Sequence, residues 1–201
     1  WLAESKHRHA REQEALTTLA AAVNQSLALD KVLETAVEQV VIAARVDAVA
    51  IFILEGTNLV LRSERGSPPE FLKMAKVAPA DTGLMGRVVQ TGKVQVVMEG
   101  LRRDPRVTSQ VVRRSDFESY VGAPLKVRDQ VVGVLSLASR RARAFNADDL
   151  AFFQAIANHI ATVIGNARLY EESQSRARRL ALLNEFAALV NRELDLKDLL
   201  Y

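Results

Sequence analysis

The sequence of 201 residues contains no cysteine. This absence excludes disulfide bonds, thiolate metal sites, a cysteine nucleophile and a thioether-linked chromophore. Histidine is scarce as well: His7, His9 and His159 are the complete set, and none of them joins Asp or Glu at a spacing typical of metal sites. No serine lies in the context of a nucleophile elbow, and no glycine-rich stretch has the pattern of a phosphate-binding loop. We therefore expect a protein that is not an enzyme and has no cofactor.

Aromatic residues make up only 5% of the chain, so the predicted core consists mainly of Val, Leu, Ile and Ala. Long apolar runs are also missing, because none approaches the roughly 20 residues that a membrane-spanning helix needs. The lack of cysteine is typical of a reducing compartment. The predicted location is the cytoplasm, either as a free protein or as the cytoplasmic part of a membrane-anchored protein.

The net charge is only +3, but arginine residues occur in short clusters. Such clusters can form a patch that binds phosphate or nucleic acid. No aromatic residues alternate with these arginines, and no DNA-reading motif accompanies them. Solvated loops and helix faces explain them better, and no nucleic-acid partner is expected. The clusters are Arg102, Arg103 and Arg106; Arg113 and Arg114; Arg140, Arg141 and Arg143; and Arg176, Arg178 and Arg179.

Several short runs rich in β-branched residues predict the strands of one sheet. Residues 47–54 (DAVAIFIL) are apolar at both alternate positions, which is typical of a central strand covered on both faces. Short helices are expected from Ser67 and over residues 84–90. The stretch from Glu99 to Phe117 is polar and irregular, and long irregular stretches within a compact domain are usually functional or mobile. The predicted strands are 47–54, 59–63, 94–98, 120–127 and 131–138.

Longer helices are predicted over residues 4–27, 30–44 and 147–193, where apolar residues recur at spacings of three and four. The third helix is too long for an ordinary globular helix, and its pattern weakens near residues 173–177. Its heptad-like spacing and the polar start of the first helix predict a dimer formed through these helices. The candidate interface residues are Leu16, Leu19, Val23, Phe153, Ile156, Ile160, Val163, Ala167 and Tyr170.

The end of the chain repeats its beginning. When Val23 is set against Val190, residues 19–33 (LAAAVNQSLALDKVL) align with residues 186–200 (FAALVNRELDLKDLL). The shared Val-Asn and Leu-x-Leu at one register predict a tandem array whose second copy begins near the C-terminus.

The order and spacing of several motifs resemble a GAF domain, the small-molecule sensory module of bacterial signalling proteins. The motifs are Leu27–Leu33, Gly83–Val88 with Thr91-Gly92, Asp104-Pro105-Arg106, Ala123-Pro124-Leu125 with Gly133–Leu137, Phe145, Asp149, and Asn166–Tyr170. The resemblance implies an α+β fold: a central antiparallel sheet with the terminal helices on one face and a pocket under short helices and loops on the other. A PAS-like sensor is the alternative fold. The expected parts are a signalling helix (1–27), the GAF domain (28–172), a coiled-coil linker (173–193) and the start of a second repeat (194–201).

The resemblance also indicates where a ligand would bind. Arg102 could hold a carboxylate or phosphate, whereas Phe117 and Tyr120 could stack on a ring. A core or surface role is the alternative for each candidate, and the sequence leaves open which strand positions face the pocket. The family members that bind cyclic nucleotides have an Asn-Lys pair, a Phe and an Asp-Glu pair, where this sequence has Ser139-Arg140, Phe145 and Asp149-Leu150. Only two of the five residues are identical and one is conservative, which argues against a nucleotide. The candidate ligand residues are Met98, Arg102, Asp104, Phe117, Tyr120 and Ser136.

Together these features predict a non-enzymatic sensory module of a bacterial signalling protein, such as a two-component system. It would form a homodimer and relay a signal from an unknown small molecule, or from a neighbouring domain, to a downstream effector such as a histidine kinase or diguanylate cyclase. The alternative is a structural dimeric spacer without a ligand, whose degenerate pocket is filled by Phe117, Tyr120 and Met98.

Overall fold

The computed structural model describes residues 29–198, and their side chains up to residue 183. The predicted helix at 4–27, with Leu16, Leu19 and Val23, lies outside the described residues, as does most of the break before residue 30. Two compact units divide at residues 164 and 165. The first contains a sheet with helices on both faces, and the second is helical.

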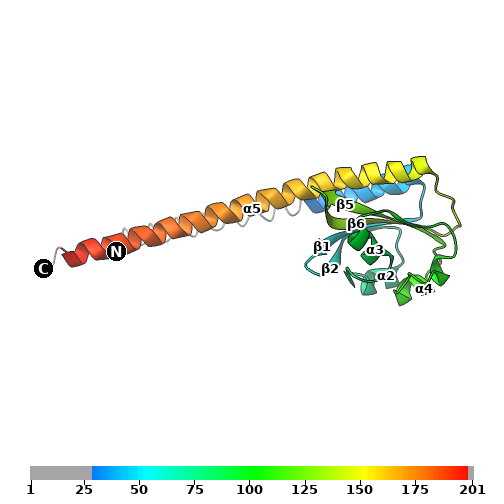
Figure 1. Ribbon diagram of the computed structural model, residues 1–201, viewed down its shortest axis with the longest axis horizontal. Helices are drawn as coiled ribbons and strands as arrows, with labels where there is room; N and C mark the ends of the chain where they lie inside the picture. The colour runs from blue at the N-terminus through cyan, green and yellow to red at the C-terminus, as the bar shows by residue number, and fades with distance from the viewer. Residues whose placement is uncertain (1–28, 199–201) are drawn as a thin grey trace. The chain divides into compact units, whose positions relative to one another are not determined.

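The first unit is built on one six-stranded sheet in which all neighbouring strands are antiparallel (Figure 1). The strand order is β3-β2-β1-β6-β5-β4, so that β1 and β6 form the middle. The five predicted strands are all present, within two residues of their predicted ends; the short β3 was not predicted. The strands are β1 (Ala48–Glu55), β2 (Asn58–Arg65), β3 (Val77–Pro79), β4 (Gln95–Val97), β5 (Ser119–Val127) and β6 (Gln130–Ser139).

Two local features of the sheet concern its central strand and the turn between β5 and β6. The first six residues of β1 are all buried, as a central strand covered on both faces requires. Strands β5 and β6 are joined by Arg128 and Asp129, with φ angles of 48° and 66°. Positive φ at both central residues is the signature of a type I′ turn, whose twist matches that of the strands it joins.

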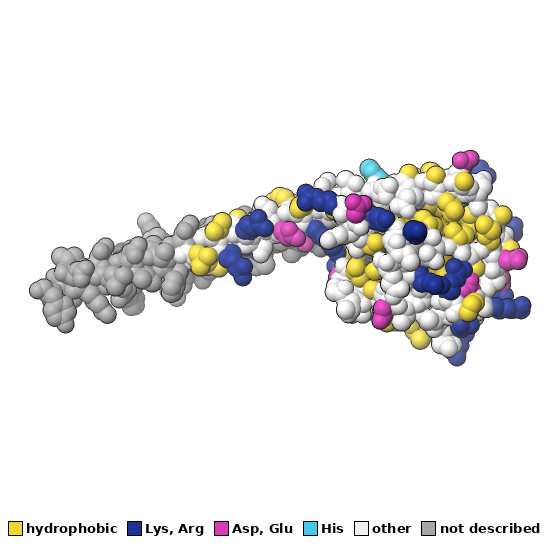
Figure 2. Space-filling model, viewed as in Figure 1, with side chains coloured by type: hydrophobic (Ala, Val, Ile, Leu, Met, Phe, Trp, Pro, Cys, Tyr) yellow, Lys and Arg dark blue, Asp and Glu magenta, His cyan; other side chains and the backbone are white. Residues whose placement is uncertain are grey.

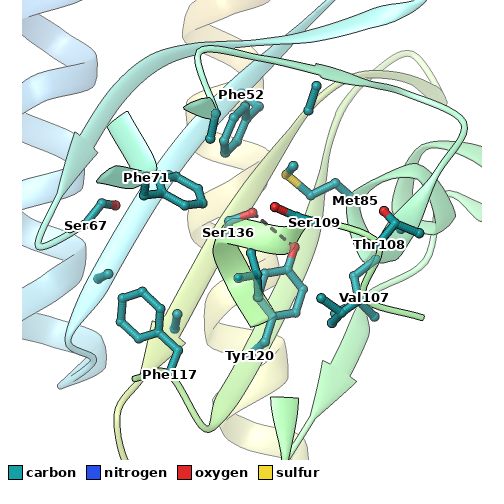
Figure 3. A pocket seen from close by; sticks show the side chains of 18 of the residues that line it. Phe52, Ser67, Phe71, Met85, Val107, Thr108, Ser109, Phe117, Tyr120 and Ser136 are labelled. Carbon is teal, nitrogen blue, oxygen red and sulfur yellow. Dashed lines mark hydrogen bonds between the residues drawn. The ribbon is translucent and has the colours of Figure 1, made fainter. Parts of the chain in front are cut away.

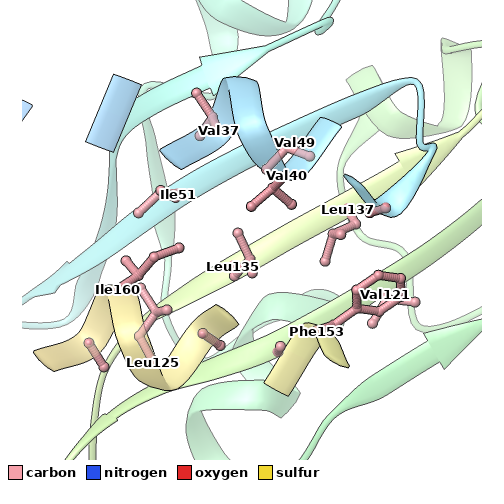
Figure 4. Close-up of a cluster of buried hydrophobic side chains, with 14 of the residues drawn as sticks. Val37, Val40, Val49, Ile51, Val121, Leu125, Leu135, Leu137, Phe153 and Ile160 are labelled. Atoms are coloured by element: carbon pink, nitrogen blue, oxygen red, sulfur yellow. The ribbon is translucent and has the colours of Figure 1, made fainter. Parts of the chain in front are cut away.

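One face of the sheet is covered by helix 29–44 and by the start of α5 (Ala147–Asp198) (Figures 1 and 4). Leu33, Val37 and Val40 of the first helix share a buried cluster with Phe153 and Ile160 of α5 and with residues of β1, β5 and β6. This cluster is the main hydrophobic core of the unit.

A capping box starts α5. The Asp149 backbone N–H donates to Asn146 Oδ1 at 2.8 Å, and the Asn146 N–H donates to Asp149 Oδ2 at 3.1 Å.

The structure changes the interpretation of the α5 stripe. Phe153 and Ile160 are only 1% and 3% exposed and pack on the sheet of their own chain, so they are not available to a partner. Ile156 also packs against this core. A helix that covers a sheet and a helix that pairs with another helix show the same spacing of apolar residues, which explains the difference. Val163 and Ala167 are half-buried, and Tyr170 is exposed.

The other face of the sheet carries short helices: α2 (Pro69–Met74), α3 (Gly83–Thr91) and α4 (Gln110–Arg114) (Figure 1). The predicted helices at these places correspond to α2 and α3. The stretch from Glu99 to Phe117, predicted to be irregular, contains α4 and the 3₁₀ turn η1 (Leu101–Arg103).

The second unit comprises the remainder of α5 from residue 165. It is helical through residues 173–177, where the apolar pattern weakens. All side chains described from 171 to 183 are exposed, including Leu180 (56%) and Leu183 (58%). Over residues 29–198, no helix is both long and apolar enough to cross a membrane.

Candidate functional site

A cavity of about 450 Å³ lies between the sheet and the short helices α2, α3 and α4 (Figure 3). This volume falls within the range of small-molecule sites. Its described lining consists of Ala48, Val49, Ala50, Phe52, Ser67, Phe71, Met74, Ala75, Val77, Ala78, Pro79, Thr82, Gly83, Leu84, Met85, Leu101, Val107, Thr108, Ser109, Val112, Phe117, Tyr120, Ser136 and Ala138.

Small side chains on the middle strands keep the cavity open. Ala48 and Ala50 of β1, with Ala138 of β6, line it. Adjacent residues of a strand point to opposite faces, and Val49 and Ile51 share the core cluster under the helices, although Val49 also borders the cavity. From Ala48 to Ile51, β1 therefore alternates small side chains toward the cavity with larger ones toward the helices, and the next cavity-facing residue, Phe52, is part of the wall. This alternation identifies the cavity face of the sheet.

Tyr120 lies across β5 because Gly122 has no side chain. A Cβ atom added at Gly122 would be 2.6 Å from the Tyr120 hydroxyl oxygen and 3.0 Å from a methyl of Val88. The space lets the Tyr120 hydroxyl come within 3.1 Å of Ser136 Oγ, and either atom can donate the hydrogen bond. Figure 3 shows this pair at the cavity, with the rings of Phe71 and Phe117 nearby.

The cavity is uncharged. None of the described residues that line it is Asp, Glu, Lys, Arg or His. Tyr120 is its one titratable group among them, and burial raises the pKa of Tyr120 to about 12, although the hydrogen bond from Ser136 works in the opposite direction. Tyr120 is therefore a neutral phenol at physiological pH.

Three of the six predicted ligand residues, Phe117, Tyr120 and Ser136, line this cavity, and the other three do not. Met98 is 47% exposed. Arg102 forms an ion pair with Glu118. The carboxylate of Asp104 accepts a hydrogen bond from the guanidinium of Arg106 at 2.7 Å, and this hydrogen bond lowers the pKa of Asp104.

Asp104 and Arg106 instead hold a loop in place. Arg106 also donates to the carbonyl oxygen of Val96 in β4 at 3.1 Å, which fixes the loop against the edge of the sheet.

The sequence did not point to the outer wall, which includes Phe71, Met85 and Val107. These residues belong to short helices and loops, where apolar residues show no period long enough to reveal an inward face.

The fold is matched by known proteins. A family model described as "GAF domain" matches residues 28–164. The chain belongs to the GAF domain family. GAF domains are sensory and regulatory modules that generally bind small molecules and occur with effector domains in signalling proteins.

Solved structures of GAF domains share this fold. The GAF domain of a phosphoenolpyruvate-protein phosphotransferase from Coxiella burnetii is 20% identical, with a TM-score of 0.65 over 78% of this chain and 96% of that one. A GAF domain/HD domain protein from Geobacter sulfurreducens is 16% identical, with a TM-score of 0.63 over 70% and 94%. A type II free methionine-R-sulfoxide reductase from Thermoplasma acidophilum is 16% identical, with a TM-score of 0.62 over 71% and 96%.

The first turn of α3 borders the cavity of this GAF domain at Gly83, Leu84 and Met85. A helix N-terminus carries about half a positive charge and stabilises a nearby anion by about 0.3–1 kcal/mol, or about 2 kcal/mol when partly buried. Burial of an ion without a counter-charge costs several kcal/mol. The gain from the helix dipole alone is smaller than this cost, so an anion at this helix end would also need hydrogen bonds from other groups.

Arginines of the loop between β6 and α5 connect the cavity wall to the helices. The Arg140 guanidinium lies 5.5 Å from the centre of the Phe117 ring and donates to Asp116 at 2.6 Å. Arg143 donates to the carbonyl oxygen of Ala44, at the end of helix 29–44, at 2.6 Å. It also lies 3.8 Å from Asp149 in the first turn of α5.

These arginines are structural rather than simply solvated. On the face shown in Figure 2, Lys and Arg side chains form small groups and no continuous patch.

Within the described residues, no group of three or more His, Cys, Asp or Glu side chains could hold a metal ion.

Proposed function

We propose that this GAF domain is a non-enzymatic sensory module of a bacterial signalling protein. A small molecule would bind in the cavity between the sheet and α2, α3 and α4, and the signal would pass to a downstream effector such as a histidine kinase or diguanylate cyclase. The open, largely apolar cavity is the observation that carries this proposal. A sensor of the two-component type in the cytoplasm, free or membrane-anchored, is the setting we expect.

The chemistry of the chain supports a binding role. The family's methionine-sulfoxide-reducing members need cysteine, and this chain has none. The described cavity lining also offers no carboxylate, imidazole or amine that could act as a general base at neutral pH.

The loop between β6 and α5 offers a route for the signal. Phe117 is part of the cavity wall, and Arg140 covers its ring while it also contacts Asp47 and Asp116. Three residues later, Arg143 holds the end of helix 29–44 beside the start of α5. A ligand that displaces Phe117 would therefore change the contacts at the ends of both helices.

The helices are the proposed dimer interface. Exposed apolar side chains on α5, among them Leu169, Tyr170, Leu180 and Leu183, support pairing of this helix with a second copy. The proposed organisation is a signalling helix (1–27), the GAF domain (28–172), a coiled-coil linker (173–193) and the start of a second GAF repeat (194–201). The repeat rests on the likeness of residues 19–33 to 186–200.

The alternative is a dimeric spacer whose pocket binds nothing. That function would be favoured by a pocket filled with its own side chains. Phe117 and Tyr120 line the cavity and leave about 450 Å³ between the walls, and Met98 is not part of the lining. The geometry favours the sensory module.

Ligand-induced thermal stabilisation tests this proposal. The protein would be melted with a panel of nucleotides, amino acids, small acids and neutral apolar compounds. Ala138 lines the cavity and Ala151 is exposed on α5, so Ala138→Phe should fill the cavity and Ala151→Phe is the matched control. We expect at least one compound to raise the melting temperature of the native protein and the control, but not of Ala138→Phe. If no compound raises it in the native protein, the spacer function is favoured.

A further inference from the structure

The lining of the cavity limits the charge of whatever binds there. A charged ligand needs a counter-charge or a set of strong hydrogen bonds when it leaves water. The described lining residues offer no ionic side chain, and Tyr120 is held in its neutral form by burial.

The arginines closest to this region in sequence are engaged elsewhere. Arg113 donates to the carbonyl oxygen of Val107 at 2.6 Å, on the loop that forms part of the wall. Arg106 is held by Asp104 and Val96. These guanidinium groups fix the wall from outside the lining, so an anionic ligand would not meet them in the cavity.

The size of the cavity and its side chains describe the apolar part of the ligand. A volume of about 450 Å³ lies in the range of small-molecule sites. Phe71, Phe117 and Met85 provide flat and flexible apolar surfaces at its walls. Such walls suit an aromatic ring or a branched aliphatic chain.

The Tyr120–Ser136 pair supplies one polar anchor. Only one of the two hydroxyl protons is used in the bond between them, so the pair keeps one donor and several lone pairs for a ligand. A ligand hydroxyl or carbonyl group could complete this hydrogen-bond chain without carrying charge.

We infer that the cavity binds an uncharged, mainly apolar small molecule, whose hydroxyl or carbonyl group is anchored by Tyr120 and Ser136. This inference rests on the proposed sensory function, because it names the ligand class of the same cavity. The inferred ligand class excludes anionic and cationic molecules of the same size.

Three probes that share a 4-butylphenyl group test the ligand class: 4-butylphenol, 4-butylbenzoate and 4-butylbenzylamine. At about pH 7 they are neutral, anionic and cationic, respectively. Isothermal titration calorimetry with the whole chain should show that the phenol binds at least about tenfold more tightly than either charged probe. The Ala138→Phe variant should lose this binding, and Ala151→Phe should keep it.

Two further variants test the anchor and the missing charge. Ser136→Ala should weaken binding of 4-butylphenol by about three- to tenfold, while binding of butylbenzene, which has no polar group, stays the same. Met85 lines the cavity from α3, so Met85→Lys places a cation there. This variant should bind the benzoate more tightly than the phenol, and Met85→Leu should retain the native preference.

Each outcome bears on the inference separately from the proposed function. Equal or tighter binding of the benzoate or the amine to the native protein would overturn the neutral ligand class, while the sensory function would stand. The class is also overturned if none of the three probes binds while a charged compound of the melting panel does, whereas binding of a neutral apolar compound of the panel would support it. Failure of every compound in the panel would contradict the sensory function itself.

Discussion

Tyr120 and Gly122 show how one missing side chain shapes the interior of the cavity. The phenol ring of Tyr120 lies over Gly122, and its hydroxyl reaches Ser136, the residue of β6 that pairs with Gly122. Any side chain at Gly122 would overlap the Tyr120 hydroxyl. The glycine therefore fixes the direction of the only titratable group among the described lining residues.

The high pKa of Tyr120 predicts that stability falls at alkaline pH. Its pKa rises from 10.0 to about 12 on folding, so below about pH 10 both states are protonated and stability is unaffected. As pH rises from about 10 to about 12, the unfolded state ionises first, and about 2–3 kcal/mol of stability is lost. Urea unfolding at about pH 9 and about pH 11 measures the first half of this loss, about 1.4 kcal/mol.

Tyr120→Phe provides the control for this titration. We expect it to be less stable than the native protein at about pH 9, by about 1 kcal/mol for the lost hydrogen bond, but to lose less on going to about pH 11. An equal loss in both proteins would show that another group causes the alkaline destabilisation.

At the residue scale, the sequence predicted the aromatic members of the site better than the charged ones. Phe117 and Tyr120 lie where a buried strand begins, and their size demands burial. Arg102 and Asp104 suggested ligand binding because the sequence could not show that Glu118 and Arg106 engage them. The alternation of alanine with larger residues in β1 was a readable signal for the cavity face.

At the scale of elements, the β5–β6 hairpin has residues that do not suit its turn. Arg128 and Asp129 have φ angles of 48° and 66°, which cost about 1–2 kcal/mol for an ordinary residue and less for Asn or Gly. The double substitution Arg128→Asn with Asp129→Gly should raise the free energy of unfolding by about 1 kcal/mol. Thermal or urea unfolding would measure the increase.

Replacement of both residues by alanine separates turn conformation from charge. This control removes the same two charges but keeps the strained φ angles, so it should give no gain in stability. A similar gain in the alanine variant would mean that the charges, rather than the backbone, limit the stability of the hairpin.

The sequence predicted the long strands and helices because their patterns extend over enough residues to be recognised. It did not predict β3, η1 and α4, which have three to five residues and no detectable period. The apolar stripe on α5 was recognised and assigned to a dimer interface, but Phe153 and Ile160 of this stripe pack on the sheet of their own chain. The spacing of apolar residues fixes the buried face of a helix, whereas the identity of what covers it depends on the rest of the fold.

At the scale of the whole molecule, the proposed dimer predicts a dependence on exposed leucines of α5. Leu180 and Leu183 are more than half exposed in the single chain, so Leu180→Glu with Leu183→Glu should shift a dimer toward monomer at micromolar concentration. Sedimentation equilibrium measures the shift. Ser175→Glu with Ala177→Glu adds the same charge at exposed positions of this helix and serves as the control.

A native chain that is strictly monomeric at micromolar concentration, with its helices intact by circular dichroism, would contradict the dimer. Equal dissociation by both double variants would mean that added charge, rather than loss of leucine, drives the effect.

The central position of β1 and β6 determines how the domain must fold. These strands pair directly although the short helices and loops of the cavity wall lie between them in the chain, and Arg143 binds Ala44 from 99 residues away. The middle of the sheet therefore forms only after a long loop has closed, and contacts of this kind slow folding. The hairpins β1–β2 and β5–β6 can form early, but neither buries its helix-facing side until the two meet. We expect a folding transition limited by the meeting of these two hairpins.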